Sequence, residues 1–183
     1  MTSATGYASF ATGISTSASN GASTAMGNST NASGQYSTAL GYITHASGEN
    51  STAMGEATEA IGYASTALGF YTIAKSDFSL SIGRFNDTSG ISLGDTTRLF
   101  SIGNGSVAGT NRSNILTATV SGVGIGTTTP AYPLDVNGII NATSYYLNGV
   151  PFTGGGGSSV GDSLVRAFDS LNIGVKYRDT LPM

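Results

Sequence analysis

Residues 37–55 read STALGYITHASGENSTAMG, and they show the repeat on which the fold prediction rests. The same pattern extends from Thr2 to about Gly83, with an alanine every seven residues from Ala4 to Ala74 and a Ser or Thr two residues before each alanine. Because this hydroxyl residue alternates strictly between Thr and Ser, the full unit has fourteen residues. A unit this short cannot bury a core by itself, so the sequence predicts a stack of coils.

The glycines that follow most of the alanines favour strands over a helix. In a coiled coil, one glycine per heptad would cost about 1 kcal/mol each relative to alanine, and leucine or isoleucine does not fill both apolar seams here. Short strands closed by tight turns fit better, because glycine takes the positive-φ conformations that such turns use. We therefore expect two short strands per coil, with turn glycines at Gly13, Gly27, Gly41, Gly55, Gly69 and Gly83.

The two-residue period of a strand assigns the side chains to faces. The alanine and Ser/Thr positions share one face, and their small size suits the thin interior of a flattened roll. The other face is apolar on one strand of each coil, and on the partner strand it is polar, with Asn31, His45 and Glu59. An isolated chain would expose the apolar row, which indicates self-association. The opposite arrangement, with the apolar row inside and the alanines facing the partner, stays open. The row consists of Met26, Leu40, Met54, Leu68 and Ile82.

These units resemble the head repeats of trimeric autotransporter adhesins, the YadA-like heads. The likeness rests on residues 37–41 and 51–55 together with Ala-Ser-Gly at 32–34 and 46–48, and it covers nearly half of the chain. It implies a left-handed parallel β-roll. It also implies that three rolls pack into a homotrimer outside a cell, which makes the apolar row the expected trimer interface.

The sequence after the repeat stays β-rich but loses its period. Alternating apolar residues at 99–102 and 115–120, separated by clusters of Gly, Asn and Ser, predict short strands and turns. Residues 123–149 resemble the region of many phage tail fibres that precedes an intramolecular chaperone domain of the endosialidase type. This second resemblance implies a trimeric fibre segment.

The chain is therefore expected to be all-β and to consist of four segments. A β-roll head occupies residues 1–83, and a β-rich fibre or neck region occupies residues 84–152. The Gly/Ser run at 153–161 has the composition of a flexible linker. Residues 162–183 form a tail with a possible short helix. Residues 158–183 either dock onto another protein or form a locally packed or disordered end.

The composition argues against several classes of function. A net charge of −3 with 9% charged residues offers no basic patch for nucleic acid. The absence of cysteine removes disulfides and thiolate metal sites. No apolar run reaches the eighteen residues that a membrane-spanning helix needs, so we expect no membrane insertion. No cofactor and no metal are expected.

Few residues of the repeat offer chemistry. His45 is the only histidine, and it is expected on the outer face with no carboxylate in its own strand. A glycosidase needs two facing carboxylates, whereas Glu49 and Glu56 are expected at opposite edges of the roll, and Glu59 is on the polar strand. The Gly-x-Gly-x-Gly run at 122–126 lacks the Lys-Ser/Thr of a phosphate-binding loop. We therefore expect no enzymatic activity.

Outward aromatic residues supply the candidate recognition surface. They follow or occupy the expected turns, and we expect them on one lateral edge of the roll. Exposed aromatic side chains commonly anchor recognition surfaces, and the alternative is that they pack across the trimer seam. The residues are Tyr7, Tyr42, Tyr63, Phe70 and Tyr71.

Taken together, the sequence favours a non-enzymatic homotrimeric extracellular fibre or adhesin segment that attaches to a host or surface. Its receptor would be an unidentified glycan or protein. The second region favours a phage tail fibre, and a bacterial surface adhesin head is the alternative. An ice-binding β-solenoid would need outward Thr-x-Thr ranks, but the single rank at 24, 38, 52 and 66 stands beside Met and Leu. A tailspike-like glycan hydrolase would need the three glutamates as catalytic groups.

Overall fold

The computed structural model describes residues 1–106, 111–140, 146–147 and 150–151. These residues form strands and turns with no helix, which confirms the all-β prediction for the described part of the chain. Two compact units are present, Met1–Ile139 and Ile140–Met183. The predicted linker and the predicted C-terminal helix lie outside the described residues.

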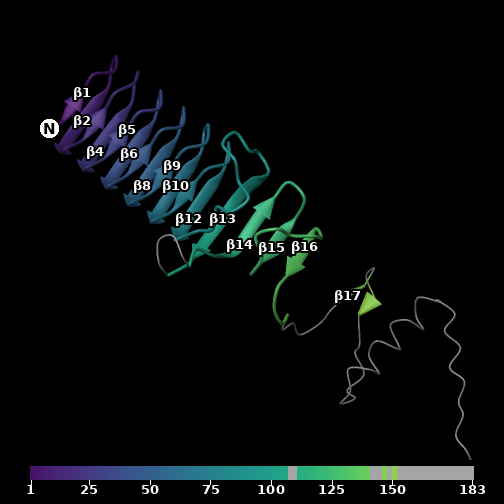
Figure 1. Cartoon of the computed structure of the whole chain (residues 1–183). Helices are drawn as coiled ribbons and strands as arrows, with labels where there is room; N and C mark the ends of the chain where they lie inside the picture. The colour runs from purple at the N-terminus through teal and green to yellow at the C-terminus, as the bar shows by residue number, and fades with distance from the viewer. Residues whose placement is uncertain (107–110, 141–145, 148–149, 152–183) are drawn as a thin grey trace, which may run out of the picture. The chain divides into compact units, whose positions relative to one another are not determined.

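The first unit begins with a parallel β-roll whose coils follow one another along the stack (Figure 1). Each coil gives a two-residue strand to one sheet, called here the short sheet, and a five-residue strand to the other, the long sheet. The short-sheet strands are β1 (Ser3–Ala4), β3 (Ser17–Ala18), β5 (Asn31–Ala32), β7 (His45–Ala46), β9 (Glu59–Ala60) and β11 (Ile73–Ala74). The long-sheet strands are β2 (Phe10–Ile14), β4 (Thr24–Asn28), β6 (Thr38–Tyr42), β8 (Thr52–Glu56), β10 (Thr66–Phe70) and β12 (Leu80–Arg84).

The strand register confirms the fourteen-residue unit. Leu40 of β6 pairs with Met54 of β8, and His45 of β7 pairs with Glu59 of β9. Every pair of neighbouring strands within the roll is parallel. Equivalent side chains of successive coils therefore lie in rows along the stack, about 4.8 Å apart.

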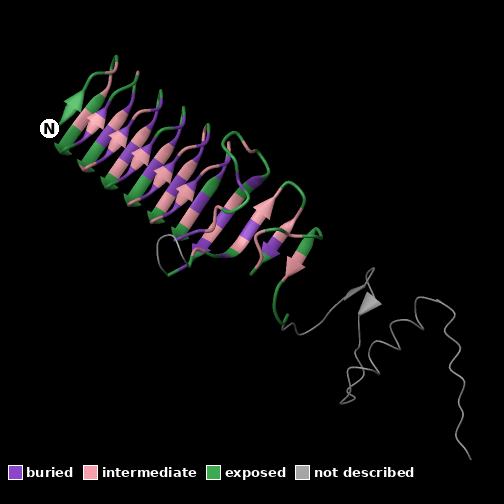
Figure 2. Ribbon diagram, in the orientation of Figure 1, coloured by how far each residue is buried: buried purple, intermediate pink, exposed green. Residues whose placement is uncertain are grey.

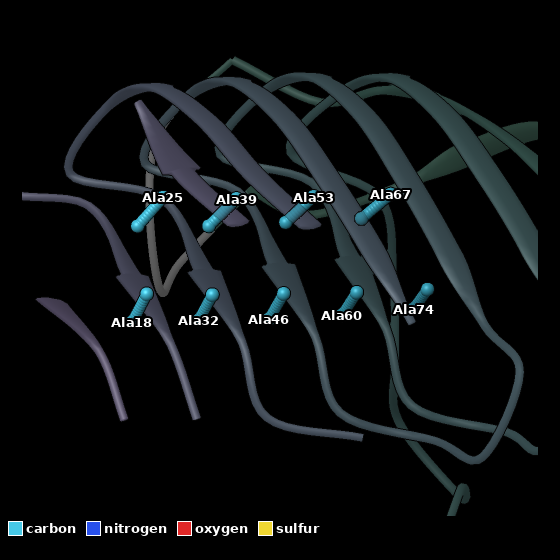
Figure 3. Packing of buried hydrophobic residues seen from close by; sticks show 9 residues of the cluster. All are labelled: Ala18, Ala25, Ala32, Ala39, Ala46, Ala53, Ala60, Ala67 and Ala74. Atoms are coloured by element: carbon cyan, nitrogen blue, oxygen red, sulfur yellow. The ribbon is translucent and has the colours of Figure 1, made fainter. Parts of the chain in front are cut away.

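The interior of the roll consists of alanine and hydroxyl side chains, as the sequence predicts. Nine alanines from Ala18 to Ala74 are fully buried and form two facing rows, one from each sheet (Figure 3). Each long strand from β4 to β12 has one buried residue, its second, and becomes exposed toward its end, as the colours of Figure 2 show. The alternative arrangement, with Met and Leu inside, is wrong, because Met26 is on the outside and 41% exposed. The buried hydroxyl residues are Thr16, Thr30, Thr44, Thr58, Thr72, Ser23, Ser37, Ser51 and Ser65.

The Thr and Ser rows differ in their hydrogen bonds. In the Ser row, which precedes the long strands, the Oγ of Ser37 donates to the carbonyl oxygen of Gly34 and that of Ser51 to Gly48, both at 2.6 Å. Ser65 is the exception in this row, because its Oγ has no partner among the described residues. In the Thr row, which precedes the short strands, the buried Oγ1 atoms from Thr16 to Thr72 have no partner among the described residues. An unpaired buried hydroxyl is destabilising by about 1–3 kcal/mol, so the Thr row stabilises the interior through its methyl groups alone.

The glycines predicted at turns lie within the long strands instead. Gly41 belongs to β6 and has a φ of 124°, a conformation that side-chain-bearing residues rarely adopt. A Cβ atom at Gly41 would overlap the carbonyl oxygen of Gly55 in the next coil. These glycines therefore allow the coils to stack closely rather than making the turns. The others in this position are Gly13, Gly27, Gly55, Gly69 and Gly83.

The positive-φ turns fall on residues other than glycine. They recur every seven residues from Ala8 to Phe85, with φ between 43° and 58°. From Ala22 onward, the N–H of each turn residue donates to a carbonyl of the preceding coil, as Ile43 does to Asn28 at 2.9 Å. A non-glycine residue in this region costs about 1–3 kcal/mol, and these hydrogen bonds between coils hold the turns in place.

The short sheet ends at β11, where one side chain replaces the next strand. Asn86 stands fourteen residues after Thr72, at the Thr position of the next coil. The N–H of Ile73 donates to Oδ1 of Asn86 at 2.7 Å, and Nδ2 of Asn86 donates to the carbonyl of Ile73 at 2.8 Å. The side-chain amide thus satisfies both backbone groups that a further strand would have paired.

The long sheet continues beyond the periodic sequence. Strand β12 pairs in parallel with β13 (Arg98–Asn104), which pairs antiparallel with β14 (Asn114–Thr119). Strands β15 (Val123–Ile125) and β16 (Leu134–Val136) complete this ten-stranded sheet. The strands expected at 99–102 and 115–120 are confirmed as β13 and β14. In the second unit, β17 (Tyr146–Leu147) and β18 (Val150–Pro151) form an antiparallel pair.

Candidate interaction surfaces

The outward apolar row extends further than its five predicted members. Within the roll, the register aligns Met26, Leu40, Met54, Leu68 and Ile82 on successive long strands. Beyond it, Ile82 pairs with Ile102, Ile102 with Leu116, Leu116 with Ile125, and Ile125 with Val136. We name these nine side chains the apolar stripe. They are Met26, Leu40, Met54, Leu68, Ile82, Ile102, Leu116, Ile125 and Val136.

The C-terminal half of the apolar stripe is widened by a second apolar line. Leu80 pairs with Phe100, and Val123 pairs with Leu134, each two residues before a member of the stripe. The prediction from sequence missed this continuation because the spacing is no longer fourteen residues. The sequence does contain a sign of this continuation, because the pattern Leu80-Ser81-Ile82-Gly83 recurs as Phe-Ser-Ile-Gly at residues 100–103.

The candidate aromatic residues lie on two edges of the roll, not on one. Tyr7 and Tyr63 occupy the turns that lead into the long strands. Tyr42 and Phe70 end long strands, and Tyr71 is the turn residue that follows. The seven-residue spacing does not distinguish the two edges, because successive turns have the same spacing but lie at opposite ends of the strands. Whether either edge binds a receptor stays a prediction.

The edge that contains Tyr71 carries a packed aromatic cluster at the end of the roll. Phe70 meets both Tyr71 and Phe85 edge to face, with ring centroids 4.8 Å and 5.2 Å apart. Tyr71 stacks on Phe85 at 5.0 Å. Phe85 is buried, so part of this aromatic surface closes the roll rather than facing solvent.

His45 has a carboxylate neighbour in the next coil, although its own strand contains none. Its partner in the next coil is Glu59, fourteen residues on, and both face outward from the short sheet. They line a groove of about 190 Å³ that also contains Tyr71 and Arg112. The fourteen-residue spacing applied to His45 would have found Glu59.

The three glutamates of the roll lie at different places. Glu49 is in a turn that leads into a long strand, Glu56 ends β8 at the other edge, and Glu59 is in the short sheet. The structure does not bring them together into the facing pair that glycoside hydrolysis requires. In the described ranges, no group of three or more His, Cys, Asp or Glu residues has the arrangement of a metal site. The described part of the chain also contains no helix long and apolar enough to span a membrane.

A buried arginine, Arg98, begins β13. The Nη1 of Arg98 donates to the carbonyl of Asp87 at 2.6 Å, and its Nη2 donates to that of Thr128 at 3.4 Å. Burial lowers the pKa of the guanidinium, and the nearby carboxylates of Asp87 and Asp95 oppose that shift. Because arginine stays charged even so, Arg98 serves to join two loops through their carbonyl groups.

The comparison with protein families supports the interpretation of the repeat. The YadA head domain repeat, a family unit of two copies, matches residues 18–42, 32–57, 46–72 and 60–86. Successive matches advance by one coil, so together they cover the stack from β3 to Asn86. This part of the chain resembles the head repeats of trimeric autotransporter adhesins, and its β-roll fits that resemblance. No curated protein matches the chain.

Proposed function

We propose that the chain is a segment of a homotrimeric extracellular fibre that attaches to a host or surface, most like a phage tail fibre. The observation that carries the proposal is the apolar stripe. It runs along the long sheet from β4 to β16 and includes Met26, Met54 and Ile125, which are 40–41% exposed in the single chain.

A continuous row of apolar side chains along a sheet favours association over the whole length of the row. Fully burying one Leu or Met side chain is worth about 1.5–3 kcal/mol. The stripe passes from the periodic coils into β13–β16 without interruption. The roll and the following strands would therefore share one threefold axis, with the short sheet of each chain facing outward.

The choice between a phage fibre and a bacterial adhesin depends on the second half of the chain. The head repeats suit both, whereas the likeness of residues 123–149 to tail fibres favours the fibre. In either case, the surface of an assembled particle or cell is the expected location. The receptor would contact the turns and the outer face, and residues 158–183 are the candidate segment for docking onto another protein.

Light scattering coupled to size exclusion tests the trimer. We expect a mass of about three times the 18.3 kDa of the chain. The double variant Leu40→Asp with Leu68→Asp should shift the protein to monomer, because it places six charges in the trimer interface. The matched control is Ser3→Asp with Asn31→Asp. It adds two negative charges to the short sheet at the same two-coil spacing, and it should stay trimeric. A monomeric wild-type chain would overturn the proposal.

A further inference from the structure

We propose that the groove on the short-sheet face binds a saccharide unit that carries a carboxylate. The groove lies at the closed end of the roll, and its seven lining residues come from three successive coils and one later loop. The inference rests on the proposed attachment function, for which it names the class of receptor. All residues that line the groove belong to one chain, so the groove itself does not depend on the trimer.

The repeat itself builds two sides of the groove. Ile43, Ala57 and Tyr71 hold the same turn position in three successive coils. His45, Glu59 and Ile73 hold the same outward position on β7, β9 and β11. The volume of about 190 Å³ is below the range of drug-sized sites, about 300–1,000 Å³. It therefore suits one ring with its substituents rather than a large ligand.

Arg112 supplies the remaining side and the positive charge. Its Nη1 donates to the carbonyl oxygens of Tyr71 at 3.0 Å and Asn86 at 3.1 Å, which fixes the guanidinium at the end of the roll. Within the described ranges, no carboxylate pairs with it, so its other N–H groups are available to a ligand. A held guanidinium fork matches a carboxylate in bidentate geometry.

The other polar groups of the groove suit hydroxyls. In the part of the chain that the structure describes, neither Glu59 nor His45 makes a side-chain hydrogen bond or ion pair, although both line the same groove as Arg112. A carboxylate accepts from neighbouring hydroxyl groups, and an imidazole accepts or donates. Tyr71, Ile43 and Ile73 offer apolar surface to the C–H groups of a ring. A ligand with one carboxylate and several hydroxyls satisfies all of these groups.

The groove is also separate from the proposed trimer interface. It belongs to the short sheet, whereas the apolar stripe belongs to the long sheet. In a trimer joined through the stripe, three grooves would face outward, and a polymer of acidic sugars would engage several of them. Weak binding of one unit would then become strong binding of the polymer through effective concentration.

The test is a titration of the whole chain with glucuronic acid, followed by NMR, with glucose as the neutral probe. We expect saturable shifts with glucuronic acid and none with glucose at the same concentration. Arg112→Gln and Arg112→Lys should each weaken binding roughly tenfold or more, the value of a lost hydrogen bond to a charged group, because lysine keeps the charge but not the bidentate fork. The matched controls Arg84→Gln and Arg84→Lys make the same changes at an exposed position away from the groove and should bind as wild type does.

Each outcome decides the proposal. Equal binding of glucose, no binding of either sugar, or equal loss in the control variants would overturn it. Thermal melting is measured for every variant, and if Arg112→Gln unfolds, Arg112→Lys decides alone. Light scattering on the same samples separates the two proposals: a trimer that binds no sugar contradicts only the groove, and a monomer that binds glucuronic acid contradicts only the trimer.

Discussion

The short and long sheets share every coil of the roll but end in different ways. The short sheet ends where Asn86 presents a side-chain amide to Ile73. The long sheet continues with β13, which begins fourteen residues after the last residue of β12, Arg84. Three further strands, β14 to β16, then extend the sheet. A single side chain, Asn86, therefore ends the short sheet at one repeat position, while the long sheet continues into strands that pair antiparallel.

This difference separates the roles of the two faces. The long sheet carries the apolar stripe across the end of the repeat, so a partner that covers the roll also covers the strands after it. The short sheet is polar on its outer face as far as Glu59, and it ends with Ile73 at the groove. The long sheet is thus suited to assembly, and the short sheet is suited to recognition.

Substitution of a stacked glycine should disturb the long sheet most. In Gly41→Ala, the added methyl group meets the Gly55 carbonyl, and the φ of 124° is strained for alanine. We expect a loss of about 3 kcal/mol or more in unfolding free energy, measured by urea denaturation. Gly90→Ala is the control, since it also has positive φ but has open space around its Cβ position, and it should lose only about 1 kcal/mol. Equal losses would mean that coil stacking is not the cause.

Removal of the amide cap should affect the short sheet alone. Asn86→Ala leaves the N–H and the carbonyl of Ile73 without partners, which should cost about 2 kcal/mol. Hydrogen exchange should become faster at Ile73 and Ile61, while the amides of β12 keep their protection. Asn86→Asp keeps the acceptor for the Ile73 N–H but sets a second oxygen against the Ile73 carbonyl and buries a charge, so it should lose at least as much stability as Asn86→Ala. Faster exchange throughout both sheets would contradict a local cap.

Most of the roll could be predicted from the sequence because its period fixes the register. The fourteen-residue unit gave the coils, the buried alanines and the outward position of Leu40. The glycines were misplaced because glycine serves both turns and close backbone contacts, and composition does not distinguish these uses. The end of the short sheet was missed because one amide that replaces a strand, as Asn86 does, leaves no pattern. The groove could not be predicted from single strands, because His45 and Glu59 become neighbours only across coils.

The smallest effects are expected from substitutions in the two rows of buried hydroxyl residues. One is in the Thr row beside the short sheet, and the other is in the Ser row beside the long sheet. Thr44→Val keeps the shape but removes a buried hydroxyl without a partner, so it should stabilise the fold by about 1 kcal/mol. Ser51→Ala removes a hydrogen bond of 2.6 Å to Gly48 and should destabilise it by a similar amount. Thermal melting of both variants measures the sign. A loss of stability in Thr44→Val would show that the hydroxyl is paired in solution, with internal water as the partner that remains for it.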